Sequence, residues 1–174
     1  MSLSNLPDPA TRPPTICDGS VCKGLVEIGR NAVIHPKCRL INEASGSIVL
    51  GNGTIIEENV QIVNKTANPL LIGDNNIIEV GAYIESAQIG NGCTIEIGAR
   101  VQRGTIIGDN CVIGVKCMTF PNQVIPDDTV IFGGQLATRK MTKSNKMQAS
   151  LHAKHLEYLH ETMPKYHHVK DETG

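Results

Sequence analysis

The amino-acid sequence predicts an all-β solenoid, a parallel β-helix with a triangular cross-section, and three observations support this fold class. An aliphatic residue recurs at every sixth position, a small or slim residue follows it by four positions, and turn-forming triplets separate the two. Because six is an even number, each strand directs the same alternating side chains inward. A corner every six residues and three corners per coil give a coil of about eighteen residues.

The aliphatic position extends through most of the chain, with three changes of register. It is filled by Ile, Leu or Val apart from Cys22 and Thr119, and its members are Ile16, Cys22, Ile28, Ile34, Leu40, Leu50, Ile56, Ile62, Ile72, Ile78, Ile84, Ile89, Ile95, Val101, Ile107, Ile113, Thr119, Ile125 and Ile131. The coil length predicts two interior ladders, one of Ile89, Ile107 and Ile125 and one of Ile95, Ile113 and Ile131. An α-helix would need a period near 3.6 and would tolerate this much Gly and Asn poorly.

The corners of the solenoid are predicted at the turn-forming triplets. These are Gly51-Asn52-Gly53, Gly73-Asp74-Asn75, Gly90-Asn91-Gly92 and Gly108-Asp109-Asn110. Gly and Asn tolerate the left-handed backbone of a tight turn. The slim residues beside them are expected to fill the narrow space inside each corner.

The repeat resembles the hexapeptide pattern of left-handed parallel β-helices. The left hand is taken from this resemblance, because the general rule for crossover connections favours the right hand. Residues 15–136 are assigned to the β-helix, with about six to seven coils that rise about 4.8 Å each.

The segments on either side of the repeat differ in composition. Residues 1–14 hold four of the nine prolines, which predicts a flexible arm. Residues 137–144 are interpreted as a linker, and 145–163 as an α-helix of about 28 Å that packs along the solenoid. Ser144 is the candidate N-cap and Pro164 the expected end of the helix, which leaves 164–174 as a polar tail.

The two ends of a β-helix carry unpaired backbone groups. Residues 134–144 are expected to cover the last coil. The prolines of the N-terminal arm cannot donate hydrogen bonds to the first coil. We therefore expect a partner to cover the coil that contains Ile16 and Cys22.

Composition excludes several classes of function. The chain has 174 residues with 16 basic and 17 acidic side chains, so it offers no basic field for nucleic acid or an anionic membrane. The aromatic content of 3% argues against domains that stack bases on rings. The apolar runs are too short for membrane insertion, and residues 1–14 lack the features of a signal peptide. These observations predict the cytoplasm, where the six cysteines stay reduced.

The cysteines are interpreted as small buried hydrophobes. Cys22 occupies the aliphatic position, and Cys38, Cys93, Cys111 and Cys117 occupy the slim one. Cys93 and Cys111 should stack in adjacent coils, close enough for a disulfide bond. We expect both to remain thiols, because the predicted location is the cytoplasm.

Histidine content decides between a non-catalytic protein and an enzyme. Two enzyme classes use this solenoid: γ-class carbonic anhydrases need three histidine zinc ligands, and hexapeptide acyltransferases need a histidine base. The coils hold only His35, which precedes Pro36 and is expected to be an exposed or locally bonded turn residue. His152 and His155 are interpreted as solvent-facing helix residues. The sequence thus assigns no catalytic, cofactor-binding or metal-binding residue and no small-molecule substrate.

The C-terminal helix carries apolar residues on two faces. A stripe suited to packing on the solenoid consists of Ala149, Ala153, Leu156, Leu159 and Met163. Met147, Leu151 and Tyr158 lie on the opposite side. Scattered apolar residues on an exposed face are ordinary, but two apolar faces also fit burial between the solenoid and a partner. Met147, Leu151 and Tyr158 are therefore the candidate partner-binding residues.

Four segments resemble the dynactin subunit 6 family, a family of hexapeptide-repeat subunits at the pointed end of dynactin. They are Val33-Ile34-His35-Pro36-Lys37-Cys38-Arg39-Leu40, residues 73–81, residues 124–133, and Pro164-Lys165-Tyr166-His167-His168-Val169-Lys170. The chain departs from the family in having only Asn64 to Pro69 where a longer insertion is common. Its tail also lacks the Ser-Pro or Thr-Pro of a proline-directed phosphorylation site.

The resemblance implies a non-catalytic scaffold that supports dynein-driven microtubule transport and cargo-adaptor engagement. It implies dynactin subunit 5, dynactin subunit 4 and a pointed-end actin-related protein as partners. It also implies a place in the cytoplasm, on the cytoskeleton.

Overall fold

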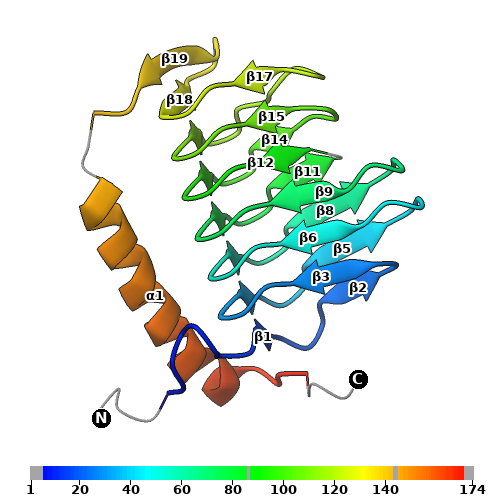
Figure 1. Ribbon diagram of the computed structural model, residues 1–174, viewed down its shortest axis with the longest axis vertical. Helices are drawn as coiled ribbons and strands as arrows, with labels where there is room; N and C mark the ends of the chain where they lie inside the picture. Colours follow the sequence, from blue (N-terminus) through cyan, green and yellow to red (C-terminus); the bar gives the residue numbers. More distant parts are fainter. Residues whose placement is uncertain (1–5, 86, 143–144, 171–174) are drawn as a thin grey trace.

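The computed structural model describes residues 6–85, 87–142 and 145–170. The coils stack from β1 (Thr15–Ile16) at one end to β18 (Thr129–Phe132) at the other, and α1 (Asn145–Tyr166) runs along one side (Figure 1). The predicted parallel β-solenoid with a C-terminal helix is confirmed.

Three sheets form the faces of the prism, and their strands are parallel except for β19. The first sheet adds to β1 and β18 the strands β4 (Val33–Ile34), β7 (Ile55–Ile56), β10 (Ile77–Ile78), β13 (Thr94–Ile95), β16 (Val112–Ile113) and β19 (Ala137–Lys140). The second sheet contains β2 (Val21–Lys23), β5 (Arg39–Asn42), β8 (Gln61–Asn64), β11 (Tyr83–Glu85) and β14 (Arg100–Val101). The third sheet contains β3 (Val26–Ile28), β6 (Ile48–Leu50), β9 (Leu70–Ile72), β12 (Gln88–Ile89), β15 (Ile106–Ile107) and β17 (Val124–Ile125).

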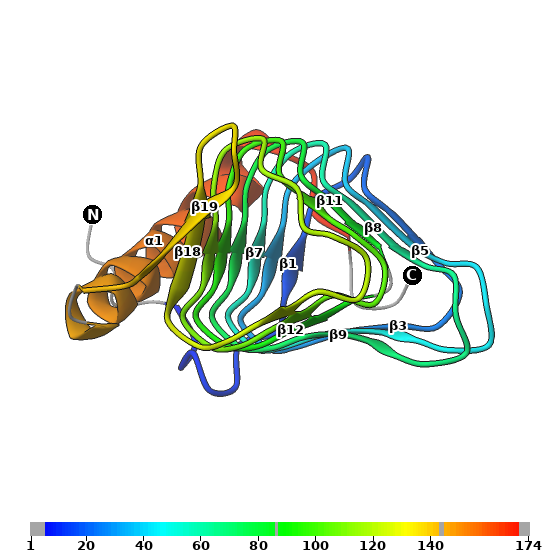
Figure 2. The same ribbon diagram turned by 90° about the horizontal axis from the view of Figure 1, so that it is seen from above.

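The hand of the coil is visible along the solenoid axis. Figure 2 shows the triangular cross-section with the last coils nearest the viewer. The chain passes clockwise from β7 to β8 to β9 while it rises toward the viewer. This path makes the β-helix left-handed, as the hexapeptide resemblance implies.

The core is built from the predicted interior ladders. Ile107 pairs in register with Ile89 below and Ile125 above, and Ile113 pairs in the same way with Ile95 and Ile131. None of these six side chains is more than 4% exposed. The predicted register is therefore correct.

Each residue of a corner triplet has a different structural role. The glycine at the first position lets two coils approach, because a Cβ on Gly90 would lie only 2.7 Å from the backbone of Gly108. The second residue bonds between coils: the N–H of Asn91 donates to Oδ1 of Asp109 (2.7 Å), and the N–H of Asp109 donates to Oδ1 of Asp127 (2.8 Å). The third residue has positive φ, for example 55° at Asn110. Only this third role was predicted from the sequence.

The last coil is closed by a strand in the segment that we interpreted as a linker. Residues 137–140 form β19, which pairs antiparallel with β18. Leu136, with φ of 53°, packs against the core at this end. Because an antiparallel strand can follow a tight turn directly, the chain reverses immediately after β18 and covers the edge of the first sheet.

The first coil is partly covered by the C-terminal segment expected to be a polar tail. Val169 forms an antiparallel bridge with Cys17, the N–H of Asp18 donates to the carbonyl of His168 (2.7 Å), and the N–H of Lys170 donates to the carbonyl of Ile16 (2.8 Å). The chain therefore covers β1 itself, where we expected a partner. Cys22 is exposed, contrary to the prediction, because β2 is the terminal strand of its sheet.

The helix and the N-terminal arm also differ from expectation. The helix continues through Pro164 to Tyr166, and the His167 N–H donates to the Met163 carbonyl (2.9 Å) at its end. Pro164 lacks an N–H and so cannot donate a helical hydrogen bond, but the bond from His167 shows that the last turn still forms. The described part of the arm is exposed at residues 7–11 but contacts the solenoid through Arg12, which is 5% exposed and donates to Oδ1 of Asn31 (2.9 Å). Residues 1–5 and 171–174, and the candidate cap Ser144, lie outside the described residues.

Candidate interaction surface

The C-terminal half of α1 is anchored on the first sheet by apolar contacts. Leu156, Leu159 and Met163 are 3–6% exposed and pack with Val33 and Ile55, the outward-facing residues of β4 and β7. Burial of a side chain of this size stabilises by about 1.5–3 kcal/mol. This part of the predicted apolar stripe lies where it was expected.

Two buried histidines add polar contacts to this docking. The ring Nε2 of His160 donates to the carbonyl of Asn31 (3.0 Å), so its Nδ1 accepts from the hydroxyl of Thr15 (2.8 Å). Nε2 of His152 donates to the carbonyl of Gly53 (2.7 Å). Burial lowers the pKa of both rings, which favours their neutral form. His152 was wrongly expected in solvent, although the successive spacings of four from His152 to Leu156 and from Leu156 to His160 place all three on one helix face.

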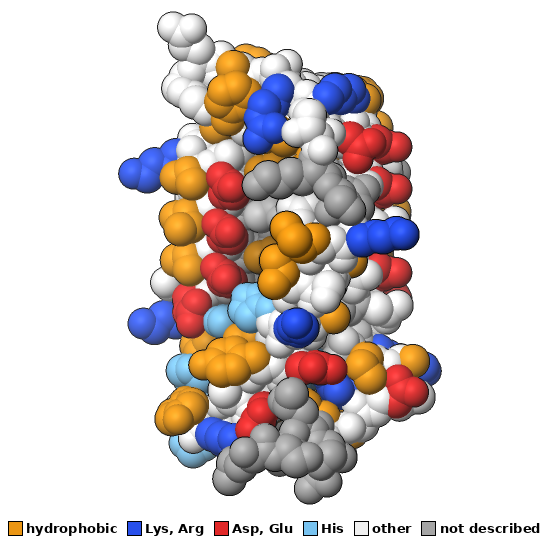
Figure 3. All heavy atoms as spheres, turned by 90° about the vertical axis from the view of Figure 1, so that its left-hand side faces the viewer, with side chains coloured by type: hydrophobic (Ala, Val, Ile, Leu, Met, Phe, Trp, Pro, Cys, Tyr) orange, Lys and Arg blue, Asp and Glu red, His pale blue; other side chains and the backbone are white. Residues whose placement is uncertain are grey.

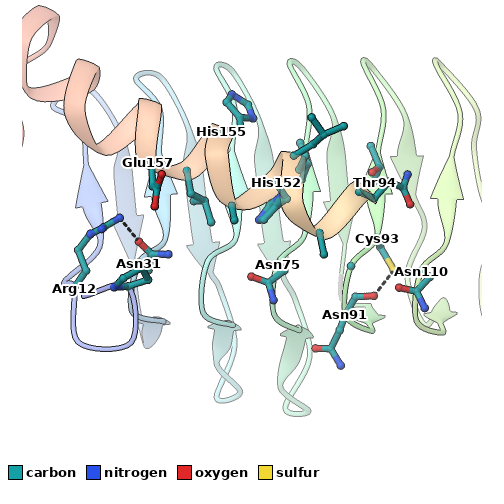
Figure 4. Close-up of a pocket in the computed structure, with 18 residues that line it drawn as sticks. Arg12, Asn31, Asn75, Asn91, Cys93, Thr94, Asn110, His152, His155 and Glu157 are labelled. Carbon is teal, nitrogen blue, oxygen red and sulfur yellow. Dashed lines mark hydrogen bonds between the residues drawn. The ribbon is translucent and has the colours of Figure 1, made fainter. Parts of the chain in front are cut away.

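The N-terminal half of α1 stands away from the solenoid. Ala149 and Ala153, predicted to contact the prism, are both exposed, and every residue from 146 to 151 is exposed. A groove of about 750 Å³ separates this half from the solenoid. Asn75, Asn91 and Asn110 lie along the solenoid side of the groove, opposite α1 (Figure 4). The periodicity located the apolar face of the helix but not the point at which contact ends.

The candidate partner-binding residues are accessible along the helix. Met147, Leu151 and Tyr158 are 64%, 59% and 60% exposed. Leu151 also lines the groove, so the apolar side chains of α1 continue into the space between helix and solenoid. These two features together form a surface on which a protein segment can bury apolar area.

His35, the one histidine of the coils, is buried and paired with a carboxylate. It is 8% exposed, and its Nδ1 lies 3.0 Å from Oε1 of Glu58. Burial is the largest influence on the pKa of Glu58 and acts to raise it, but the hydrogen bonds from His35 and from the backbone, together with the charges of His35 and His167, lower the pKa below its ordinary value. The expectation of an exposed or locally bonded turn residue was wrong, because His35 is buried and its partner Glu58 belongs to the adjacent coil.

The cysteines at the slim positions are buried thiols, as predicted. Cys93 and Cys111 lie in adjacent coils, where the N–H of Cys111 donates to Sγ of Cys93 (3.4 Å). Each thiol donates to a carbonyl, that of Gly108 for Cys93 (3.0 Å) and that of Pro126 for Cys111 (3.1 Å). These bonds give both buried thiols a hydrogen-bond acceptor.

Among the residues that the structure describes, no three His, Cys, Asp or Glu side chains gather where they would hold a metal ion. No helix in the described part of the chain is long and apolar enough to span a membrane.

Comparison with known proteins identifies close relatives along nearly the whole chain. A dynactin subunit 6 of Nematostella vectensis is 37% identical over 165 residues, which cover 89% of this chain and 88% of the relative. A dynactin subunit 6 of Dictyostelium discoideum is 36% identical over 182 residues, which cover 97% and 96%. A family model described as bacterial transferase hexapeptide (six repeats) matches residues 86–118.

Solved structures with the same fold include proteins named as transferases. A hexapeptide transferase family protein from Anaplasma phagocytophilum superposes with a TM-score of 0.72 at 15% identity, covering 86% of this chain and 92% of that one. A putative acetyltransferase of Bacillus cereus gives 0.59 at 16% identity, covering 85% and 90%. At such identities the likeness establishes the fold alone.

Proposed function

Because the chain belongs to the dynactin subunit 6 family, we propose that it is a non-catalytic scaffold subunit of the dynactin pointed-end complex. The observation that carries the proposal is the similarity over about nine-tenths of the chain to relatives named for a place in dynactin. In this role the protein assembles with dynactin subunit 5, dynactin subunit 4 and the pointed-end actin-related protein in the cytoplasm, on the cytoskeleton. It thereby supports dynein-driven microtubule transport and the engagement of cargo adaptors.

The exposed side of α1 is the surface that we assign to partner binding. Exposed aromatic and aliphatic side chains are typical anchors of protein interfaces, and Leu151 and Tyr158 supply both kinds on one helix. The absence of packing around residues 146–151 supports the assignment, because two isolated helical turns have little stability of their own.

Co-expression with the three pointed-end partners tests this assignment. The variant Leu151→Asp with Tyr158→Ser should lose co-purification, whereas its melting temperature should change by no more than about 2 °C because both side chains are about 60% exposed. A matched control makes the same chemical changes elsewhere, Leu71→Asp on the third sheet with Tyr166→Ser at the helix end, and should bind normally. A large loss of stability in the first variant would show that this side of α1 is packed internally, and the interface assignment would fail.

A second candidate function is acyl transfer or zinc-dependent catalysis, which the transferase names of the structural neighbours motivate. His35 is buried against Glu58, so it presents little surface to a substrate. Purified protein can be assayed with acyl-CoA donors and for bound zinc. Stoichiometric zinc, or acyl transfer abolished by His35→Ala, would replace the scaffold proposal with an enzyme.

A further inference from the structure

An exposed aliphatic column runs up the corner between the first and second sheets. Val80, Ile97 and Val115 occupy equivalent positions in successive coils and are 37%, 48% and 54% exposed. They lie two residues after the ends of β10, β13 and β16 of the first sheet, respectively. Figure 3 shows such a column of hydrophobic side chains beside a column of acidic ones. Three aliphatic side chains stacked in solvent do not contribute to the core of this chain.

The acidic column is formed by Glu57, Glu79 and Glu96, each of which directly follows the last residue of a strand of the first sheet. Glu79 and Glu96 immediately precede Val80 and Ile97 of the aliphatic column, whereas Glu57 precedes Glu58. Each carboxylate accepts one backbone N–H from the next coil: Glu57 from Val80 (3.2 Å), Glu79 from Ile97 (3.1 Å) and Glu96 from Val115 (2.9 Å), the Oε2 atom being the acceptor in each case. These bonds fix the glutamates in a row at the coil spacing of about 4.8 Å.

These hydrogen bonds require a side-chain acceptor at each of the three positions, but they do not require that the side chain carry a negative charge. A glutamine oxygen would accept the same N–H. Burial and the neighbouring charges of Glu57 and Glu96 raise the pKa of Glu79, so the row carries an electrostatic cost. Among the described residues none of the three glutamates has a cationic partner within salt-bridge distance.

We propose that the aliphatic column with its acidic neighbour is a docking surface for a partner helix that carries a row of Lys or Arg beside a row of aliphatic residues. The proposal rests on the proposed function and specifies the chemistry of one partner contact. The negative charge of the acidic column calls for basic side chains on the partner helix. The exposed aliphatic column calls for apolar side chains beside them. A helix rises about 5.4 Å per turn, close to the coil spacing, so a helix parallel to the solenoid axis places successive turns beside successive coils.

The location fits a single continuous interface with α1. Ile77 of β10 packs against the anchored half of α1, and Glu79 lies two residues later at the corner. The acidic column therefore borders the sheet on which α1 lies. A partner bound to the exposed side of α1 can extend a helix along this corner.

The test measures binding of the purified protein to immobilised, co-expressed pointed-end partners over a range of salt concentrations. The variant Glu79→Gln with Glu96→Gln removes two charges and keeps the acceptors, so its melting temperature should match the wild type. We expect binding about tenfold weaker at low salt and a flatter salt dependence. The control Glu27→Gln with Glu43→Gln removes two charges from exposed positions outside the column and should bind as the wild type does.

A second variant tests the aliphatic column separately. Ile97→Asn should weaken binding by about fivefold at every salt concentration and leave the salt dependence unchanged. Wild-type binding by all three variants would overturn the docking proposal and leave the proposed function standing. Equal losses in the control and in the Glu79 and Glu96 variant would overturn it as well, since the charge effect would then not be local. If the wild type captures none of the partners, the proposed function fails and the docking proposal fails with it.

Discussion

Replacement of Ile107 by Ala tests the interior register of the solenoid. Ile107 is 2% exposed and stacked between Ile89 and Ile125. The change removes three carbons, about 2.4 kcal/mol at about 0.8 kcal/mol per buried CH₂. The hydrogen-bonded strands above and below restrict collapse into the space left behind, which adds a cavity cost. We expect the free energy of unfolding to fall by about 3–4 kcal/mol.

The matched control is Ile106→Ala, the neighbouring residue in β15. Ile106 is 45% exposed because alternate residues of a strand face opposite sides, so its loss should cost less than about 1 kcal/mol. Urea unfolding followed by circular dichroism measures both values, provided that the m-value is unchanged. Equal costs for the two variants, or a larger cost for Ile106→Ala, would refute the assigned register.

Three further changes give distinct outcomes. Gly90→Ala should lower the melting temperature by several degrees, measured by calorimetry, because its Cβ would meet the backbone of the next coil; an unchanged value would show that the coils move apart freely. Docking of α1 should weaken below about pH 6.5, the ordinary pKa of histidine, because the pKa values of His152 and His160 are lowered in the folded state and protons then favour the undocked helix. Hydrogen exchange of residues 152–163 measures this loss, and exchange that is constant from pH 7 to 5 would contradict it. Leu136→Ser should reduce thermal stability by removing an apolar contact at the last coil, whereas Leu25→Ser, at a side chain 57% exposed, should not.

Periodic features of this protein could be read from its sequence because the interior repeats the same environment in every coil. The ladders through Ile107 and Ile113 follow directly from the spacing. The same spacing wrongly predicted that Cys22 is buried. The spacing indicates which side chains point inward, but not whether another coil lies beyond them. Among the corner residues, positive φ at Asn110 follows from residue type. The close approach at Gly90 requires knowledge of the neighbouring coil.

Contacts between distant segments account for the remaining differences. The pairing of Val169 with Cys17 joins opposite ends of the chain, and no local pattern indicates it. The exposure of Ala149 and Ala153 depends on the angle of α1, whereas helical periodicity defines only the face. The aliphatic column of Val80, Ile97 and Val115 recurs with the same period as the core, but its exposure emerged only from the structure.

The bridge between Cys17 and Val169 has a consequence for synthesis of the chain on the ribosome. Coils can form one upon another as they emerge, each using the previous coil as a template. The outer edge of β1, however, stays open until the C-terminal segment is made, since Lys170 reaches Ser20 across 150 residues of sequence. At about 5–20 residues per second, this interval lasts on the order of ten seconds. For that time the nascent chain presents an unprotected strand edge, so chaperone association should be strongest while the first coils are complete and the last residues are still unmade.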